Sequence, residues 1–496
     1  MDVKNIETEL SKFIYELETE DRLVRVGLKE KAETSKIYKK YQNLFTREVL
    51  DGLKKQINKT GNAKTREILQ RIYFTIAGSF IGLKTAVLDD SIKTYFSQAK
   101  VKVRNEELAY FQISPKIAKE PVFDQRELYS DAIDYVITKI SPKQLELLNT
   151  EVKLIQNLGY GNYLAFYAKA KKMDYANFNK IADKIKKETD NLWQRTIEKV
   201  SKEILGRSFK NLRSCHMVYL RSLSMFDNLY PKEKVVSTFL QFANDLGLAD
   251  LLSRVKIDDK DRPRKNPRAV CYWPKPPQEV HLVIKPIGGE QDFEAMFHEG
   301  GHALHGAAVD TKLPYALKTL SRSGALTETY AFILEDLVFN PLWLSTFLNV
   351  SANSAQRIQK QAYFVNLMML RRYLGKFSYE YEMFSQNAIA KGPALYAKNL
   401  QNLTGFITKK IYWLSDMDSG FYSADYLRAW IGAAQIKDYL KRKFGQKWFL
   451  NPKAGKFLRG LFARGVSDEV EDVVRKLSYR PFDISLLVSG YKKVLS

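Results

Sequence analysis

A run of prolines interrupts a chain whose pattern is otherwise helical, and this interruption most constrains the fold. Residues 1 to about 260 read as successive amphipathic helices, as in Ile197–Phe209 (IEKVSKEILGRSF), where apolar residues recur every three or four positions. Six of the fifteen prolines fall between Pro263 and Pro286, and proline excludes a helix interior. Helical patterning then resumes to the C-terminus. We therefore expect a mostly α fold with one small β-sheet.

The proline-rich stretch contains the best strand candidate. Glu279–Ile284 (EVHLVI) has the β-branched and aliphatic composition of a strand. Gly288 and Gly289 follow it and predict a turn, after which Asp292 is a suitable N-cap for a helix that begins near Phe293.

Length and cysteine content limit the organisation of the chain. For 496 residues we expect a helical N-terminal part over residues 1–205 and a second part over residues 206–496, joined as one continuous structural unit. The two cysteines, Cys215 and Cys271, exclude a disulfide scaffold and a cysteine-ligated zinc ribbon.

Charge and targeting patterns narrow the partners. The chain has 79 basic and 56 acidic residues, a net charge of +23, but its lysines are scattered along helical faces, so no nucleic-acid partner is expected. The N-terminal sequence MDVKNIETELSKF shows no signal or transit pattern. The uncharged stretch Ile72–Leu83 is too short to span a bilayer. These patterns predict a cytoplasmic protein with no membrane partner.

Three of the five histidines lie within eight consecutive residues, in the sequence HEGGHALH. His298 and His302 are four residues apart, so on a helix their rings share one face and suit a zinc ion. Glu299 follows the first histidine and can reach a metal-bound water as general base. The sequence therefore predicts a catalytic zinc centre that holds one Zn²⁺ per chain.

A catalytic zinc site needs a third protein ligand and an open position for water. His216, beside Cys215, fits a structural role, which leaves a carboxylate as the natural third ligand. Glu328 and Glu335 lie seven residues apart on a downstream apolar helix and share a face. By spacing alone, either could be the ligand.

HEGGHALH followed about 25 residues later by this acidic helix resembles the thimet oligopeptidase and oligopeptidase F family of zinc metallopeptidases. The resemblance covers roughly residues 265 to 435. It implies that Glu328 is the third ligand and Glu335 the second acid of the E-x₆-E helix, in a two-lobed helical fold around a deep central cleft.

The same resemblance extends to the segment Asp418–Trp430, which is similar to the family's glycine- and tyrosine-rich segment. It implies that Tyr426 or Tyr422 donates a hydrogen bond to the oxyanion. The family often places a histidine before this segment, whereas this chain has Asp416 and Asp418 there.

Other residues are candidates for roles around the metal or the substrate. Glu335 can orient a zinc-bound imidazole through its free N–H. His305 is a candidate for contact with the substrate or with the metal ligands, the alternative being a packed histidine. The strand that carries His281 matches the family's edge strand and would pair with an extended peptide. Arg322 and Arg428 are candidates for holding a peptide carboxylate.

The expected activity is zinc-dependent hydrolysis of short oligopeptides by a metal-bound water that Glu299 activates. A related helical zinc carboxypeptidase is one alternative. A basic, helical nucleic-acid-binding protein with a structural zinc site is another. The sequence leaves open the cleavage preference, the oligomeric state and the role of the positive charge.

Overall fold

The computed structural model describes residues 2–496 and is mostly α-helical, which confirms the predicted fold class. These residues form two small sheets, whereas the sequence predicted one. The two-lobed arrangement around a deep cleft stays a prediction.

The chain divides into two compact units, each assembled from three separate segments. Unit 1 comprises Met1–Val87, Phe226–Ala355 and Arg428–Asp483, and unit 2 comprises Leu88–Met225, Gln356–Leu427 and Ile484–Ser496. Each unit combines early and late segments of the chain. The division into lobes at residues 205 and 206 stays a prediction.

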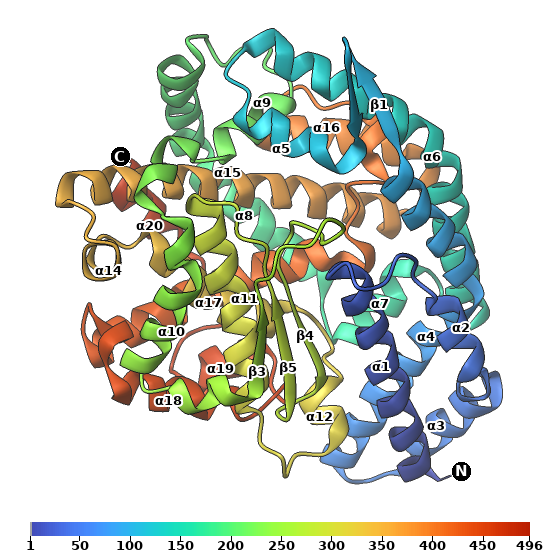
Figure 1. The fold of residues 1–496 in the computed structure, drawn as a ribbon. Coiled ribbons are helices and arrows are strands. Elements are labelled where there is room, and N and C mark those ends of the chain that lie inside the picture. The colour runs from blue at the N-terminus through green and yellow to red at the C-terminus, as the bar shows by residue number, and fades with distance from the viewer. Residues whose placement is uncertain (1) are drawn as a thin grey trace. The chain divides into compact units, whose positions relative to one another are not determined.

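The helices carry most of both units, and Figure 1 shows their course along the chain. The α-helices of unit 1 are α1 (Val3–Arg25), α2 (Thr34–Lys40), α3 (Arg47–Lys59), α10 (Val235–Asp245), α11 (Glu290–Ala308), α12 (Tyr315–Thr319), α13 (Ala325–Glu335), α14 (Pro341–Phe347), α18 (Pro452–Phe462) and α19 (Val470–Lys476). Those of unit 2 are α5 (Tyr110–Lys119), α6 (Phe123–Asn157), α7 (Tyr163–Lys171), α8 (Tyr175–Val200), α9 (Cys215–Arg221), α16 (Gly392–Thr404) and α20 (Ser485–Leu495). Three long helices continue from one unit into the other: α4 (Ala63–Gln98), α15 (Ala352–Ser385) and α17 (Tyr422–Phe444).

Unit 1 contains a three-stranded sheet. Its strands are β3 (Val255–Asp258), β4 (Val270–Lys275) and β5 (Glu279–Val283), in the order β3-β5-β4, with β3 parallel and β4 antiparallel to β5. The predicted strand is confirmed as β5, one residue shorter. β4 contains Pro274, which an outer strand tolerates because one side of its backbone needs no ladder partner.

The position of β5 corrects one prediction. Because β5 lies between β3 and β4, both of its edges are already hydrogen-bonded within the sheet. The strand that carries His281 therefore has no free edge, and the prediction that it pairs with an extended peptide is wrong. The outer strands of the sheet are β3 and β4.

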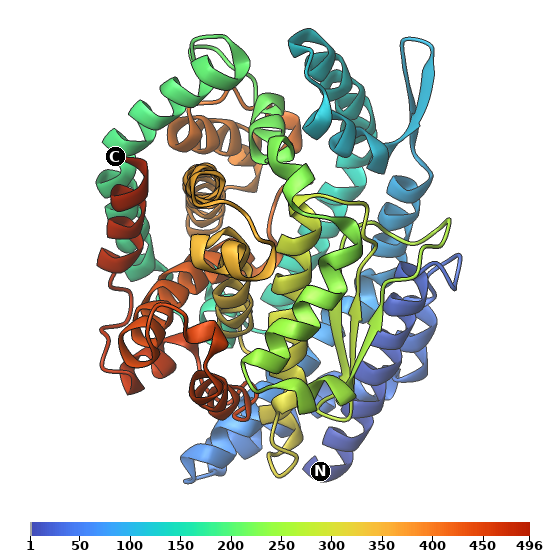
Figure 2. The same cartoon turned by 60° about the vertical axis from the view of Figure 1, so that its left-hand side comes forward.

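Helices pack against both faces of this sheet. Successive side chains of β4 point toward opposite faces, so neighbouring residues of the strand contact different helices. The ring of Trp273 lies against Gly306 of α11, where an added Cβ would come within 2.6 Å of the indole. The hydroxyl of Tyr272 donates to Oδ2 of Asp21 in α1 at 2.5 Å. Figures 1 and 2 show α1 on the β4 side of the sheet.

Helix α11 begins earlier than the sequence predicted. Its N-cap is Gly289, at a φ of 104°, and its first residue is Glu290. Asp292 lies inside the first turn, and its Oδ2 accepts the N–H groups of Ile287 and Gly288. Asp292 therefore fixes the loop before the helix instead of capping it.

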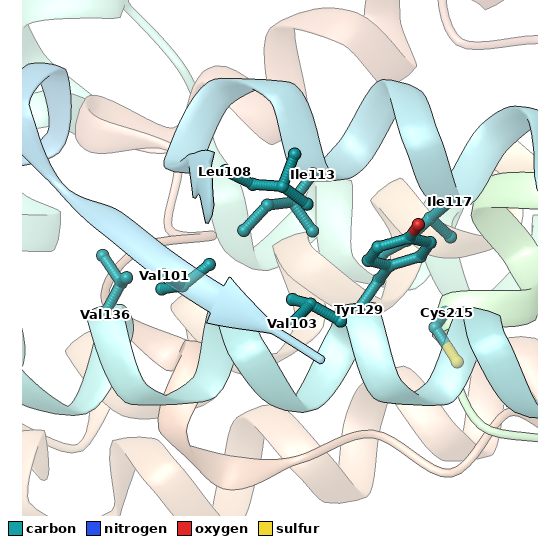
Figure 3. Packing of buried hydrophobic residues seen from close by; sticks show 8 residues of the cluster. All are labelled: Val101, Val103, Leu108, Ile113, Ile117, Tyr129, Val136 and Cys215. Atoms are coloured by element: carbon teal, nitrogen blue, oxygen red, sulfur yellow. The ribbon is translucent and has the colours of Figure 1, made fainter. Parts of the chain in front are cut away.

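The sheet that the sequence analysis missed is a hairpin in unit 2. β1 (Lys100–Val103) and β2 (Glu106–Ala109) pair antiparallel, and their inward residues join a hydrophobic cluster with α5, α6 and α9 (Figure 3). The cluster consists of Val101, Val103, Leu108, Ile113, Ile117, Tyr129, Val136 and Cys215. Tertiary packing thus stabilises β1 and β2, two strands of four residues each that the sequence pattern did not predict.

Helix α4 is longer than its uncharged stretch suggested. It has 36 residues, and an 18-residue window of mean hydropathy 1.3 gives it the length and composition of a membrane-crossing helix. Of that window, 44% is buried inside the protein, and core helices of folded proteins share this composition.

Candidate metal centre

The candidate site is built on two helices of unit 1 that pack closely. Gly301 of α11 faces the backbone of α13, where an added Cβ would lie 2.7 Å from Cα of Ala331. At Gly300 an added Cβ would lie 2.2 Å from the ring of Phe239. The two glycines therefore allow α11 to approach its neighbours, and the close approach brings the histidines of α11 to the acids of α13.

His298, His302 and Glu328 form one group of possible metal ligands. Nε2 of His298 lies 3.4 Å from Oε2 of Glu328, and Nε2 of His302 lies 3.8 Å from Oε1 of the same carboxylate. Ligand atoms about 2.0–2.1 Å from a tetrahedral zinc ion lie about 3.4 Å apart. The donor set and its spacing fit zinc, with Glu328 as the carboxylate that faces both imidazoles.

Glu335 contacts the opposite side of the His298 ring. Its Oε2 lies 2.5 Å from Nδ1 of His298. Burial by itself lowers the pKa of His298, but Glu328 and Glu335 outweigh burial and raise this pKa well above its ordinary value. Glu335 thus lies where an acid that orients a metal-bound imidazole is expected.

Glu299 lies on α11 between the two histidines. Its carboxylate is partly exposed and forms no hydrogen bond or ion pair within residues 2–496. Its negative charge contributes to raising the pKa of His302, although burial has the larger effect and lowers that pKa overall. An unengaged carboxylate beside the histidines is available for proton transfer.

His305 does not reach the surface. It is fully buried, its Nε2 lies 3.0 Å from the carbonyl oxygen of Gly465, and its ring packs edge-on against Trp273 and Tyr330. Burial lowers the pKa of His305 to about 3. The predicted substrate contact of His305 is therefore wrong, and the alternative of a packed histidine describes it.

His281 is also nearly buried. Its side chain is 9% exposed, and its Nε2 lies 2.8 Å from Oε1 of Glu279 in the same strand. Burial lowers the pKa of His281 against the opposing effect of Glu279. The side-chain partner of His281 therefore lies in its own strand, and no candidate metal ligand or catalytic residue hydrogen-bonds to it among residues 2–496.

A second group with metal-ligand chemistry occurs in unit 2 and fits a metal less well. Glu127, Cys215 and His216 bring their ligand atoms close together. However, Nε of Arg126 donates to Nδ1 of His216 at 3.1 Å, which keeps the proton of the neutral ring on Nε2, toward Glu127. Metal-bound histidines show the reverse arrangement, with the distant nitrogen as donor. These contacts match the structural role predicted for His216.

The two candidate tyrosines lie in unit 2, at the start of α17. The rings of Tyr422 and Tyr426 are 5.0 Å apart, and Tyr426 also packs against Tyr373 at 4.9 Å. The buried carboxylate of Asp425 pairs with Lys171 at 2.6 Å. Fixed neighbours therefore hold this turn of α17, and the assignment of an oxyanion donor stays a prediction.

The two candidate arginines are structural. Arg428 forms a bidentate ion pair with Glu471, with both N···O distances at 2.8 Å. Arg322 pairs in the same way with Glu67, at 2.7 and 3.0 Å. Both arginine side chains are buried, so neither offers a free guanidinium to a peptide carboxylate.

Unit 2 also contains a cavity of about 280 Å³ between α8, α15 and α16. Its lining is largely polar and includes Asp183, Tyr381 and Asn399. None of the predicted site residues lines it, so the cavity is separate from the metal centre.

Comparison with known proteins finds similarity of structure. No family model and no curated protein sequence match the chain. It is similar to the structure of PZ peptidase A with inhibitor 2, at 13% identity and a TM-score of 0.68 over 96% of this chain and 85% of that one. It is also similar to a protein described as an oligoendopeptidase F from Bacillus anthracis strain Ames, at 16% identity and a TM-score of 0.61 over 92% and 85% of the two chains. A further structure described as an oligoendopeptidase F shows 14% identity and a TM-score of 0.67 over 90% and 83%. The chain therefore has the fold of these peptidases over nearly its full length.

Proposed function

We propose that the chain is a zinc metallopeptidase of the thimet oligopeptidase and oligopeptidase F type that hydrolyses short oligopeptides. The observation that carries this proposal is the placement of His298 and His302 opposite Glu328 at 3.4 and 3.8 Å. The fold shared with PZ peptidase A supports it.

His298, His302 and Glu328 would hold the zinc ion, with one position left for water. When bound, zinc lowers the pKa of that water toward about 7 and polarises the scissile carbonyl. Glu335 keeps the proton of His298 on Nδ1, so that Nε2 is free to act as a ligand.

Glu299 acts as the general base. Its carboxylate accepts a proton from the attacking water and delivers it to the departing amine. The lack of hydrogen bonds to Glu299 supports this role, because no neighbour has to be displaced before the proton moves.

Tyr426 or Tyr422 donates a hydrogen bond to the oxyanion of the tetrahedral intermediate. One such donor typically contributes about 3 kcal/mol to the stability of the transition state. The resemblance of Asp418–Trp430 to the tyrosine segment of the family supports this part of the proposal.

The outer strand β4 replaces β5 as the strand that aligns the substrate. A peptide laid along an outer strand is read through its backbone, which favours broad tolerance of side chains. We therefore expect short, flexible peptides as substrates.

The experiment compares the wild type with Glu299→Gln, both loaded with zinc, on a pool of short peptides analysed by mass spectrometry. The wild type should release products that disappear when a chelator is added. Glu299→Gln should bind one zinc per chain and release none. Asp310→Asn, an exposed acid just beyond α11, serves as the matched control and should retain full activity.

Turnover by Glu299→Gln at the wild-type rate would contradict the role of Glu299 as general base. Wild-type activity that a chelator does not reduce would contradict the role of the metal. Peptides with amidated C-termini separate the two types of peptidase, because a carboxypeptidase requires the free carboxylate and an oligoendopeptidase does not.

A further inference from the structure

Helix α1 lies along the sheet on the side of β4 (Figures 1 and 2). The hydroxyl of Tyr15 donates to Oε2 of Glu279 at 3.3 Å, and Asp21 accepts from the hydroxyl of Tyr272 at 2.5 Å. Glu18 stands three residues after Tyr15 and three before Asp21. The helical period therefore turns Glu18 toward the same sheet.

The carboxylate of Glu18 engages the backbone of β4. The N–H of Trp273 lies near enough to this carboxylate to lower its pKa, while its Oε2 atom is buried and lacks a hydrogen-bond partner within residues 2–496. Burial raises the pKa of Glu18 to about 7 against the opposing effect of the Trp273 N–H. Glu18 is thus a half-buried acid with one buried oxygen atom that no donor within residues 2–496 satisfies.

This acid lies close to the proposed reaction centre. Cys271, two residues before Trp273 in β4, has a pKa raised well above its ordinary value by burial, then by the negative charge of Glu299, and further by that of Glu18. The Cys271 thiol therefore lies within electrostatic range of both carboxylates. Glu18 and the general base belong to the same part of unit 1.

The two acids that flank Glu18 at a distance of two residues have cationic partners. Glu16 pairs with Lys40 at 2.5 Å, and Glu20 pairs with Lys29 at 2.6 Å. Glu18 forms no ion pair with any side chain in the described part of the chain. In a chain with a net charge of +23, a half-buried acid with a buried, unpartnered oxygen and no cation indicates that a positive charge arrives with a ligand.

We infer that Glu18 is a specificity-determining residue that binds a protonated primary amine of the peptide substrate, supplied by the α-amino group or by a lysine side chain. The inference rests on the proposed peptidase function and adds a preference for substrate charge to it.

The backbone of β4 explains why an amine is favoured at this point. A peptide that pairs with the outer edge of β4 needs the N–H of Trp273 as a donor for one of its carbonyl oxygens. The Glu18 carboxylate lies beside that N–H, so a peptide carbonyl meets a negative charge there and is repelled. An ammonium group is attracted to the carboxylate and supplies the donor that Oε2 lacks.

Turnover of matched quenched peptides by the zinc-loaded enzyme tests the inference. One pair has the same sequence with a free or an acetylated amino terminus, and a second, fully acetylated pair carries lysine or norleucine beside the scissile bond. We expect kcat/KM to be about tenfold higher for the amine-bearing peptide in the pair whose amine reaches Glu18. Glu18→Gln should abolish this difference by raising KM for that peptide with kcat unchanged.

The pair that loses its difference identifies the source of the amine. Glu16→Gln, the same substitution two residues away on the Lys40 side of α1, should preserve the wild-type preference. Equal losses on both members of each pair would show that Glu18 only supports α1 and would overturn the inference, as would an unchanged preference in Glu18→Gln. A zinc-loaded wild type that hydrolyses none of the four peptides would instead overturn the proposed function.

Discussion

The Nδ1 atom of His298 lies 2.5 Å from Oε2 of Glu335, so an acid of α13 contacts the side of this ring that faces away from the other candidate ligands. Glu328 faces the Nε2 side of the same ring at 3.4 Å. The two acids are seven residues apart on α13, two helical turns, and one rigid helix therefore sets both contacts.

Replacing Glu335 by glutamine should weaken zinc binding without unfolding the protein. The amide can still contact Nδ1, but it removes the charge that makes His298 a stronger ligand. We expect about a 10- to 100-fold loss of zinc affinity. Competition with a fluorescent chelator measures it.

The neighbouring acid provides the control for this measurement. Asp336 pairs with Lys437 and not with His298. Asp336→Asn should leave the zinc affinity unchanged, and an equal loss in both variants would mean that Glu335 has no specific part in the site.

Gly301→Ala should destabilise the protein, although alanine favours helices. The new Cβ would lie 2.7 Å from Cα of Ala331, a backbone atom that a side-chain rotation cannot move. Overpacking of this kind costs about 1–3 kcal/mol beyond the gain of about 1 kcal/mol in helix propensity. Urea unfolding followed by circular dichroism gives the change in free energy.

Gly460→Ala in α18 is the matched control, because nothing lies within 4 Å of its added Cβ. This variant should be more stable than the wild type by about 1 kcal/mol. If Gly301→Ala were as stable, the close contact between α11 and α13 would not constrain the site.

The pH dependence of stability should reveal Glu151 in α6. Burial, with a smaller contribution from Asp89, raises the pKa of Glu151 from 4.5 to about 7 in the folded protein. A group with a raised folded pKa loses its stabilising contribution as the pH rises from 4.5 through 7. Glu151→Gln should therefore match the wild type at pH 4 and exceed its stability at pH 8 by about 2 kcal/mol, allowing for partial solvation of the side chain.

Thermal unfolding at the two pH values measures this difference. Glu146→Gln, an exposed acid one turn earlier in α6, should show no pH-dependent gain. A Glu151→Gln variant with the same pH profile as the wild type would contradict the prediction.

Removal of one hydroxyl group at a time should show whether Tyr426 or Tyr422 donates the hydrogen bond to the oxyanion. If Tyr426 is the oxyanion donor, Tyr426→Phe should lower kcat by about 10²-fold with little change in KM, because the bond forms only in the transition state. Tyr422→Phe should then have a much smaller effect on kcat. The reverse pattern would assign the donor role to Tyr422. Near-normal rates in both variants would mean that neither tyrosine is the oxyanion donor.

Much of the candidate metal centre could be predicted because its chemistry is local in sequence. The spacing of His298 and His302 fixes a common helical face, and a carboxylate was the natural third ligand. Spacing alone could not choose between Glu328 and Glu335. In the structure the two acids divide the contacts, with Glu328 opposite both imidazoles and Glu335 behind one of them.

The incorrect predictions concern residues whose environment depends on segments far away in the sequence. The EVHLVI pattern identified β5, but only the pairing with β3 and β4 shows that it is central. His305 shares the helix of the ligands, yet packing against Trp273 and Tyr330 buries it. Glu18 is not among the predicted site residues, because an acid in a run of acids on an amphipathic helix is typical of a solvated face. Its environment depends on β4, some 250 positions later in the chain.

The interleaving of the two units has a consequence for biosynthesis. Unit 1 draws on residues as late as Asp483, and unit 2 draws on Gln356–Leu427 and on the last helix. A ribosome must therefore deliver most of the polypeptide before either hydrophobic core can close, so the early helices emerge without their final partners and are exposed to aggregation in the meantime. A truncation near the C-terminus would remove material from unit 2 at once and from unit 1 soon afterwards, so the chain is unsuited to division into separately expressed halves.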